Sequence, residues 1–366
     1  MEIKEILKKD AFDKEDIIAL LSASEASDIT LIRKKAFSTL KKYCGEKVYY
    51  RGLIEFSNVC DNDCFYCGIR KSNKNCERYL LSQKQIVDSA VWCANQGYGS
   101  VVLQSGERTG VSFVNFVEEA IKNIKEKTIS PNLPDGVGIT LCVGEHDYET
   151  YKRFFDAGAH RYLLRIETTS PELYKKIHPE TMSLDHRKEC LKLLQKAGFQ
   201  VGTGVMIGLP EQTIEELAND ILFFKEYNVD MIGMGPYITH KDTPMVRYED
   251  ENKKTQKERF LLALKMIAVT RLVLKDVNIA ATTALQAIDP VGREKGLQFG
   301  ANVVMPQLTP TEVRKEYQLY DNKPCTDEKA SDCENCLSTR LEHIGRTVAI
   351  NEWGDPKHFA NRSKGI

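Results

Sequence analysis

Strand-like and helix-like segments alternate along most of this 366-residue chain, and the alternation constrains the fold more than any other feature. Short runs rich in β-branched and apolar residues precede longer stretches in which apolar residues recur every three or four positions. Such units pair their strands in parallel through right-handed crossovers. Eight of them predict an α/β fold, a (β/α)8 TIM barrel. A six-strand partial barrel is the alternative, because the last two strand-like runs are short.

The same patterns divide the chain into parts. The strand-like runs cover residues 48–57, 99–105, 136–142, 160–167, 199–205, 230–235, 277–283 and 301–305. The clearest helical patterns between them cover residues 82–95, 113–125, 184–196, 213–227 and 256–273. We therefore predict N-terminal helices over residues 1–45, the barrel over residues 46–308, and an irregular C-terminal cap over residues 309–366.

Charge and apolar content limit the classes of function. The 51 Lys and Arg residues nearly balance the 52 Asp and Glu residues, so no global field favours nucleic acid or an anionic membrane. No apolar stretch approaches the length of a transmembrane helix, and the first nine residues are rich in Lys and Glu. We expect a cytoplasmic protein that acts on a small molecule or a protein. Six of the 11 cysteines fall in two tight groups, which favours metal binding over disulfides.

The first cysteine group directly follows the first strand-like run. Cys60, Cys64 and Cys67 have the spacing Cys-x3-Cys-x2-Cys. Three thiolates suit a cubane iron–sulfur cluster in which one iron has no protein ligand. A closed zinc site would need a fourth ligand, and the loop contains no histidine; Cys76 is a weak candidate for a fourth cysteine. Three metal-free thiols are the remaining alternative, and the aromatic Tyr66 before Cys67 favours the cluster.

Polar residues also gather where other predicted strands end, which is where barrel enzymes carry their reacting groups. Arg161, Arg165 and Glu167 alternate onto one face of the fourth predicted strand. Charges inside a barrel are costly unless they are paired or bind a ligand, so they predict a polar site, with a structural ion-pair network as the alternative. Thr282 and Thr283 end the seventh predicted strand, where their hydroxyls could bind an anionic group, although threonine is common in strands.

A second cysteine group lies in the predicted C-terminal cap. Cys325, Cys333 and Cys336 have the looser spacing Cys-x7-Cys-x2-Cys. We predict that they hold an auxiliary iron–sulfur cluster, either 2Fe-2S or 4Fe-4S. A zinc site completed by His343, or no metal at all, are the alternatives.

The chain resembles a known family over roughly residues 50–340. The Cys-x3-Cys-x-aromatic-Cys loop after a strand is similar to the signature of the radical S-adenosylmethionine (SAM) superfamily. Further segments resemble the FeFe-hydrogenase maturase HydE family, which is related to biotin synthase and methylornithine synthase. These segments cover residues 51–58, 103–107, 162–168, 231–236, 281–284 and 317–320. The chain departs from the superfamily pattern at Ser105, where a glycine is usual.

This resemblance implies cofactors and site residues. The first cysteine group would hold a 4Fe-4S cluster whose open iron chelates SAM, and reductive cleavage of SAM would give a 5'-deoxyadenosyl radical. SAM would contact Glu167, Arg187, Tyr66, Gln104, Ser105 and Met231, although Arg187 could instead be a solvated helical arginine. The substrate cavity would be lined by Arg161, Arg165, Thr140, Thr282, Thr283, Met305, Tyr317 and Tyr320.

The resemblance also implies a role in building the dithiolate-bridged diiron subcluster of FeFe-hydrogenase. A tyrosine-cleaving radical SAM maturase would supply an organometallic iron–cysteine substrate, and a scaffold GTPase would receive the product. An external reductant would supply electrons, and neither nucleic acid nor membrane is expected as a partner. Two alternatives stay open: a radical SAM enzyme that acts on an amino acid, such as methylornithine synthase, and a non-catalytic iron–sulfur carrier.

Overall fold

Eight parallel strands close into a barrel in the computed structural model, which describes residues 2–249, 252–327 and 339–363. The strands are β1 (Lys47–Ser57), β2 (Ser100–Ser105), β3 (Gly138–Cys142), β4 (Arg161–Leu163), β5 (Gln200–Thr203), β7 (Met231–Ile232), β9 (Asn278–Ile279) and β10 (Val303–Val304). Their order is β10-β1-β2-β3-β4-β5-β7-β9. A parallel bridge between Ala280 and Val303 joins the two ends of this order into a ring. The predicted (β/α)8 barrel is therefore confirmed.

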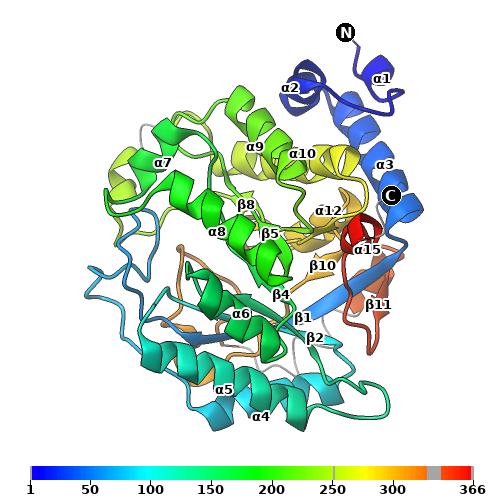
Figure 1. Ribbon diagram of the computed structural model, residues 1–366. Helices are drawn as coiled ribbons and strands as arrows, with labels where there is room; N and C mark the ends of the chain where they lie inside the picture. Colours follow the sequence, from blue (N-terminus) through cyan, green and yellow to red (C-terminus); the bar gives the residue numbers. More distant parts are fainter. Residues whose placement is uncertain (1, 250–251, 328–338, 364–366) are drawn as a thin grey trace.

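Helices surround the strands (Figure 1). They are α4 (Gln83–Asn95), α5 (Val111–Lys127), α6 (Tyr148–Asp156), α7 (Pro171–Ile177), α8 (Leu184–Ala197), α9 (Ile214–Glu226), α10 (Gln256–Val273), α11 (Thr283–Ile288) and α12 (Gly292–Gln298). Capping boxes at Ser82, Thr213 and Thr255 satisfy the first backbone N–H groups of α4, α9 and α10, which explains where these helices begin. Among the described residues, no helix combines the length and apolar character needed to cross a bilayer.

Several strands are shorter than the sequence pattern predicts. Strand β4 ends at Leu163, and after this break Glu167, whose φ of 65° is left-handed, forms an isolated parallel bridge with Val205. Strand β9 ends at Ile279, and Thr282 is already the extended N-cap residue of α11. After β5 and β7, two further segments, β6 (Met206–Ile207) and β8 (Gly235–Pro236), form a separate parallel pair. The apolar pattern of these strands therefore extends beyond the residues that pair with neighbouring strands of the barrel.

Alternation along β1 separates the apolar core from a polar barrel interior. Ile54 and Phe56 belong to the main apolar cluster, which also contains the buried faces of the surrounding helices. Arg51 and Glu55, on the opposite face of the strand, are 5% and 1% exposed. Because successive strand side chains point to opposite faces, these two charges lie inside the ring. The barrel interior is therefore the place to look for a site.

Three N-terminal helices pack on the outside of the barrel. They are α1 (Ile3–Ile6), α2 (Lys14–Ser22) and α3 (Ala26–Tyr43). Helix α3 packs against α10, and α2 packs against α9 and α10. The buried Lys265 of α10 donates a hydrogen bond to the carbonyl of Ala23, 2.9 Å away, between α2 and α3. Burial of Ile17, Leu20 and Leu21 explains the amphipathic pattern of this region.

The C-terminal region contacts both ends of the barrel (Figure 1). Beyond α13 (Thr311–Arg314), the carbonyl of Leu319 accepts a hydrogen bond from the N–H of Gly68, in the segment that follows the C-terminal end of β1. Strand β11 (Thr347–Ala349) instead pairs with the first residues of β1, and α15 (Lys357–Ser363) follows it. Residues 309–327 therefore lie at the mouth of the barrel, and residues 347–363 lie at its opposite end.

Candidate cofactor and substrate site

The three cysteines of the first group lie in the loop that leaves the C-terminal end of β1. The N–H of Asp61 donates to the carbonyl of Glu107, 2.8 Å away, so this loop lies beside the loop that follows β2. A side chain at Gly106 would meet the carbonyl oxygen of Val59 at 2.4 Å and Cβ of Cys60 at 2.7 Å. Glycine at this position therefore lets the two loops approach each other closely.

The thiols of this loop are costly to ionise without a nearby cation. Burial raises the pKa of Cys64 to about 12, against the opposing charge of Arg187 and together with the charge of Cys60. Burial and the charges of Cys64 and Cys60 raise the pKa of Cys67 well above its usual value. Iron ions would supply the missing positive charge, because metal coordination deprotonates a thiol outright.

The spacing of these thiols suits a cluster better than a single ion. In the described part of the chain, three ligating atoms lie within 4.8 Å of one another only in a different group. The sulfurs of Cys60, Cys64 and Cys67 are therefore spread more widely than the ligands of one zinc ion. Cys76 lies with other partners, 3.3 Å from Nδ2 of Asn58 and 3.4 Å from the carbonyl oxygen of Glu316. Three thiols of one loop that do not all lie within 4.8 Å of one another suit a cubane held by three cysteines better than a single zinc ion.

Glu167, Arg165 and Arg187 form a charged group beyond the end of β4. Nη2 of Arg165 donates to Oε2 of Glu167 at 2.9 Å, and Nη1 of Arg187 donates to the carbonyl of Arg165 at 3.2 Å. The left-handed backbone of Glu167 is uncommon for a residue other than glycine, and such strain concentrates at functional sites. It is held by backbone hydrogen bonds to Gly204 and Met206.

Arg187 is buried and is not a solvated helical arginine. It is 8% exposed, its Nε lies 2.5 Å from Oε1 of Glu145, and its Nη2 lies 3.8 Å from Oε2 of Glu107. Although burial alone would lower it, the charges of Glu145 and Glu107 raise the pKa of Arg187 well above its usual value. Sequence reasoning missed Glu145, which follows the third strand in the segment Val143-Gly-Glu145.

Tyr66 connects the cysteine loop to an apolar wall. Its hydroxyl lies 3.4 Å from Nε2 of His178, and its ring packs on a small cluster that includes Met206 and Leu209. Burial, followed by the charges of Cys64 and Glu167, raises the pKa of Tyr66 well above its usual value. Tyr66 therefore lies close to both the cysteine loop and the charged group of Glu167.

The mouth of the barrel holds a second polar group, around Tyr317. Nε2 of Gln104 donates to the Tyr317 hydroxyl at 3.3 Å, and Nζ of Lys323 lies 5.1 Å from the centre of the Tyr317 ring. Lys323 also forms a buried ion pair with Glu55, at 2.5 Å. Burial, followed by the charge of Glu55, raises the pKa of Tyr320. Sequence reasoning missed Glu55, whose partner is distant in the sequence.

The predicted hydroxyl groups at the mouth of the barrel make local contacts. Ser105 and Thr282 donate to backbone carbonyls, and Thr283 begins a helix. The Ser105 hydroxyl donates to the carbonyl of Gly106 at 2.8 Å, and the Thr282 hydroxyl donates to the carbonyl of Met234 at 3.2 Å. Thr283 is the first residue of α11 instead of a strand residue. The predicted pair of threonines therefore stands at a helix start, beside β8.

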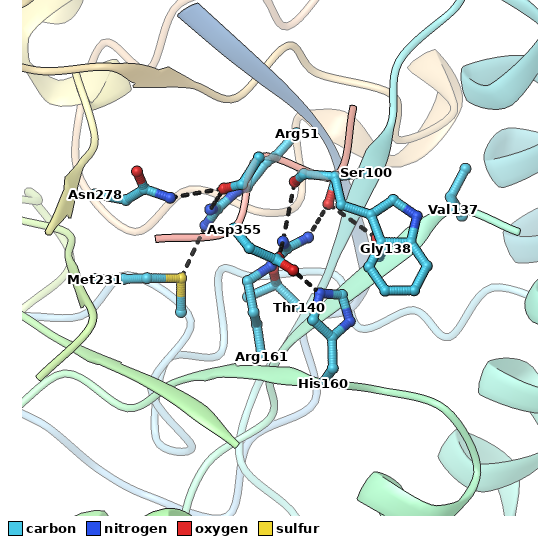
Figure 2. Close-up of polar contacts among 12 residues, drawn as sticks. Arg51, Ser100, Val137, Gly138, Thr140, His160, Arg161, Met231, Asn278 and Asp355 are labelled. Atoms are coloured by element: carbon cyan, nitrogen blue, oxygen red, sulfur yellow. Dashed lines mark hydrogen bonds and ion pairs between the residues drawn. The ribbon is translucent and has the colours of Figure 1, made fainter. Parts of the chain in front are cut away.

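Arg161 is the first residue of β4, at the end of the barrel opposite the cysteine loop, which leaves the C-terminal end of β1. Figure 2 shows Arg161 with Thr140, Ser100 and Asp355 around it. Nε of Arg161 donates to Oγ1 of Thr140 at 2.9 Å, and Nη1 of Arg161 lies 2.5 Å from Oδ1 of Asp355. Burial lowers the pKa of Arg161 to about 10, partly offset by Asp355. The structure does not bring these two residues together with Glu167 and Arg187.

Met231 also lies at this end of the barrel. Its sulfur accepts a hydrogen bond from Nη1 of the buried Arg51 at 2.9 Å (Figure 2). Arg51, Thr140, Met231 and Met305 contribute to the wall of a largely apolar cavity inside the barrel. The remaining wall residues are Val102, Leu163, Ile232, Gly233, Asn278, Ala280 and Val303. The structure therefore places Met231 on the cavity wall, apart from Tyr66.

The second cysteine group is described only at its first member. Cys325 has a left-handed φ of 63°, and Nη2 of Arg293 lies 3.7 Å from its sulfur. Nη1 of Arg314 donates to the Cys325 carbonyl at 3.3 Å. Cys333 and Cys336 lie outside the described residues. One arginine side chain therefore lies near the Cys325 sulfur, and a second contacts the backbone carbonyl of the same residue.

Comparisons with known proteins identify the family. A model of the radical SAM superfamily matches residues 54–224. The FeFe-hydrogenase maturase subunit HydE of Thermotoga maritima is 42% identical over 97% of both chains. A 3-methylornithine synthase of Methanosarcina acetivorans is 25% identical, covering 92% of this chain and 90% of its own length. A biotin synthase of Bacillus thuringiensis is 28% identical over 79% of this chain and 84% of its own.

Solved structures show the same fold. A methylornithine synthase structure has a TM-score of 0.76 at 22% identity and covers 100% of this chain and 99% of its own. The FeFe-hydrogenase maturase HydG of Carboxydothermus hydrogenoformans has a TM-score of 0.79 at 18% identity and covers 98% of this chain and 82% of its own. With the HydE relative above, these findings show that this chain belongs to the HydE family of radical SAM enzymes.

Proposed function

We propose that this protein cleaves SAM reductively and acts in assembling the diiron subcluster of FeFe-hydrogenase. The observation that carries the proposal is the identity of 42% to a HydE maturase over nearly the whole chain. The site supports it, because a loop of three cysteines lies beside an ion-paired Glu167–Arg165 unit at the mouth of the barrel. The alternative, amino-acid mutase activity as in methylornithine synthase, has weaker support, because the identity to that relative is 25%.

Cys60, Cys64 and Cys67 would hold the cluster, and the charged group would hold SAM. When bound, the cluster supplies the electron that breaks a carbon–sulfur bond of SAM. The Glu167 carboxylate would accept a hydrogen bond from the SAM ammonium group, while Arg187 would pair with the SAM carboxylate. Because Glu145 and Glu107 already flank Arg187, its guanidinium is oriented before a ligand arrives.

The remaining SAM contacts would come from the mouth of the barrel. Tyr66, with Met206 and Leu209 beside it, offers an apolar surface for the adenine ring and would exclude water. Gln104 and Ser105 follow one another at the end of β2, next to the cysteine loop. We propose that they position the methionine part of SAM. Met231, which accepts a hydrogen bond from Arg51 at the other end of the barrel, is not one of these contacts.

The substrate would lie deeper in the barrel. Arg165 and Tyr317 face the mouth, whereas the cavity wall includes Thr140 and Met305, with Arg161 hydrogen-bonded to Thr140 at the far end. The Arg165 guanidinium, whose side chain is 30% exposed, would favour an anionic or organometallic iron–cysteine substrate. The other proposed substrate contacts are Thr282, Thr283 and Tyr320.

Partner maturases and a further cluster complete the proposal. A tyrosine-cleaving radical SAM maturase would supply the substrate, a scaffold GTPase would receive the product, and an external reductant would donate electrons. We also propose that Cys325, Cys333 and Cys336 hold an auxiliary cluster. Arg293, whose Nη2 lies 3.7 Å from the Cys325 sulfur, supports this, since a positive side chain stabilises a thiolate ligand.

A maturation assay tests the function. We expect that an apo-hydrogenase incubated anaerobically with the other maturation factors gains hydrogen-evolving activity only when this protein, reconstituted with iron and sulfide, is added with SAM. The control is the same mixture with the Cys64→Ala protein. If hydrogenase stays inactive while lysine is converted to methylornithine, the proposed function is wrong and the mutase alternative holds.

Replacing Glu167 with glutamine should weaken SAM binding by about tenfold or more, because a charge-assisted hydrogen bond contributes roughly 1.5–3 kcal/mol. Isothermal titration of SAM into the cluster-loaded variant measures this change. Glu211→Gln is the matched control, since Glu211 also has a left-handed φ, of 63°, but pairs with Lys176 on the surface. Unchanged SAM affinity with a lowered melting temperature would assign Glu167 a structural role instead.

A further inference from the structure

Three potential metal ligands meet beside Arg187, outside the cysteine loop. Glu145 belongs to the segment that follows β3, and His186 and Cys190 are four residues apart on α8. Residues at this spacing lie on the same face of a helix. In the described part of the chain, these three residues are the one group of three or more whose ligating atoms all lie within 4.8 Å of one another.

The distance between Glu145 and His186 matches a shared metal ion better than a direct hydrogen bond. Nε2 of His186 lies 3.6 Å from Sγ of Cys190 and 3.6 Å from Oε2 of Glu145. The second separation exceeds the roughly 2.7–3.2 Å of a normal hydrogen bond between nitrogen and oxygen. Ligands about 2.0–2.3 Å from a tetrahedral zinc ion are separated by roughly 3.3–3.8 Å from one another. The three atoms are thus spaced to share an ion between them.

The surroundings give the group both a fixed carboxylate and a route for an ion. Oε1 of Glu145 lies 2.5 Å from Nε of Arg187, which leaves Oε2 directed toward His186. Such outer contacts commonly orient metal-binding carboxylates. The Cys190 side chain is buried, whereas the His186 side chain is 60% exposed, so the group is open to solvent on one side.

The local charges also favour a divalent cation. With a metal bound, a Cys190 thiolate and the Glu145 carboxylate would carry two negative charges, and Glu107, 3.8 Å from Arg187, offsets the positive charge of that arginine. A doubly charged ion would therefore make the group neutral. One sulfur, one imidazole nitrogen and one carboxylate oxygen suit a metal of intermediate softness, such as zinc, and suit magnesium or calcium poorly.

We propose that Glu145, His186 and Cys190 bind a divalent transition-metal ion, with Zn²⁺ as the best match, at a site separate from the Cys60–Cys64–Cys67 loop. The three protein ligands leave a fourth position for water or for a ligand from solvent. This site does not depend on the proposed maturase function, because it is argued from metal-ligand geometry alone.

Zinc binding to the cluster-loaded protein tests the site. The second cysteine group is first removed by Cys325→Ser, Cys333→Ser and Cys336→Ser, and the Cys60–Cys64–Cys67 loop is occupied by its cluster. After equilibrium dialysis against buffered Zn²⁺, we expect one zinc per chain without loss of iron. X-ray absorption at the zinc edge should show one sulfur neighbour at about 2.3 Å together with lighter neighbours at about 2.0 Å.

His186→Ala is the decisive variant, because an exposed side chain can be removed without unfolding the helix. We expect it to weaken zinc binding by more than the roughly 10- to 100-fold typical of outer-shell partners. Cys190→Ser should remove the sulfur neighbour, while His343→Ala and Cys93→Ser, an exposed histidine and a buried cysteine elsewhere, should change neither. Zinc uptake at the expense of iron, a spectrum without sulfur, or unchanged affinity in His186→Ala would overturn the proposal.

Discussion

Replacing Cys64 with alanine should reduce the cleavage of SAM to 5'-deoxyadenosine and methionine to background. A cubane held by three thiolates loses a third of its protein ligands, and the two that remain come from a loop whose thiols already resist ionisation. The measurement is chromatographic detection of 5'-deoxyadenosine after anaerobic reconstitution and reduction with dithionite. Iron content and cluster absorbance should fall in the same sample.

Cys76→Ala provides the matched control for this variant. Cys76 is a neighbouring, partly buried thiol, but it contacts Asn58 and the carbonyl of Glu316. We expect this variant to keep its iron and its cleavage activity. Loss of both in Cys76→Ala would mean that four cysteines hold the cluster, and full cleavage by Cys64→Ala would remove the cofactor site from this loop.

Local sequence signals predicted most of the fold. Helices α4, α9 and α10 begin one residue after Ser82, Thr213 and Thr255, whose hydroxyls cap them. The apolar residues that follow recur at helical spacing, so the sequence alone predicts these helices. The ends of β4 and β9 were not predictable in the same way. Glu167 leaves the strand through a left-handed backbone that hydrogen bonds to Gly204 and Met206 hold in place, and those partners are distant in the sequence.

In the candidate site too, contacts between residues close in the sequence could be predicted, and contacts between distant residues were missed. The ion pair of Arg165 with Glu167 joins residues two apart in the sequence, so their proximity could be expected from the sequence, although β4 ends before both of them. Glu55 meets Lys323, and Arg161 meets Asp355, across most of the chain. Single-sequence patterns carry no register between such segments, so only the folded barrel reveals these pairs.

The pair of Arg161 and Asp355 closes the end of the barrel opposite the cysteine loop (Figure 2). The Arg161 side chain is fully buried, and besides Asp355 it donates hydrogen bonds to the carbonyl of Trp353, at 3.0 Å, and to the Ser100 hydroxyl. Burial lowers the pKa of His160 to about 4, so this neighbour of Asp355 is neutral at pH 7. Arg161 is thus the charged ion-pair partner of Asp355, and the carboxylate also offsets the charge of the nearby buried Arg51.

Asp355→Ala should therefore lower the free energy of unfolding by about 2–3 kcal/mol, measured by urea denaturation. Removing one partner of a fully buried ion pair costs roughly 3–5 kcal/mol, and the smaller value is expected here because the Asp355 side chain is 41% exposed. Glu352→Ala is the control in the same segment: its ion pair with Lys47 is exposed on both sides, and the change should stay within about 0.5 kcal/mol.

A double variant shows whether the uncompensated charge is the cause. Adding Arg161→Met to Asp355→Ala replaces the buried guanidinium with an apolar side chain, so most of the lost stability should return. The effect of Asp355→Ala should also disappear in acid, because hydrogen bonding from His160 and the charge of Arg161 hold the pKa of Asp355 below its usual value despite burial. Its contribution is present above pH 4 and is lost as the pH falls through the lowered pKa. A double variant no more stable than Asp355→Ala would show that the carboxylate stabilises the segment through its other contacts.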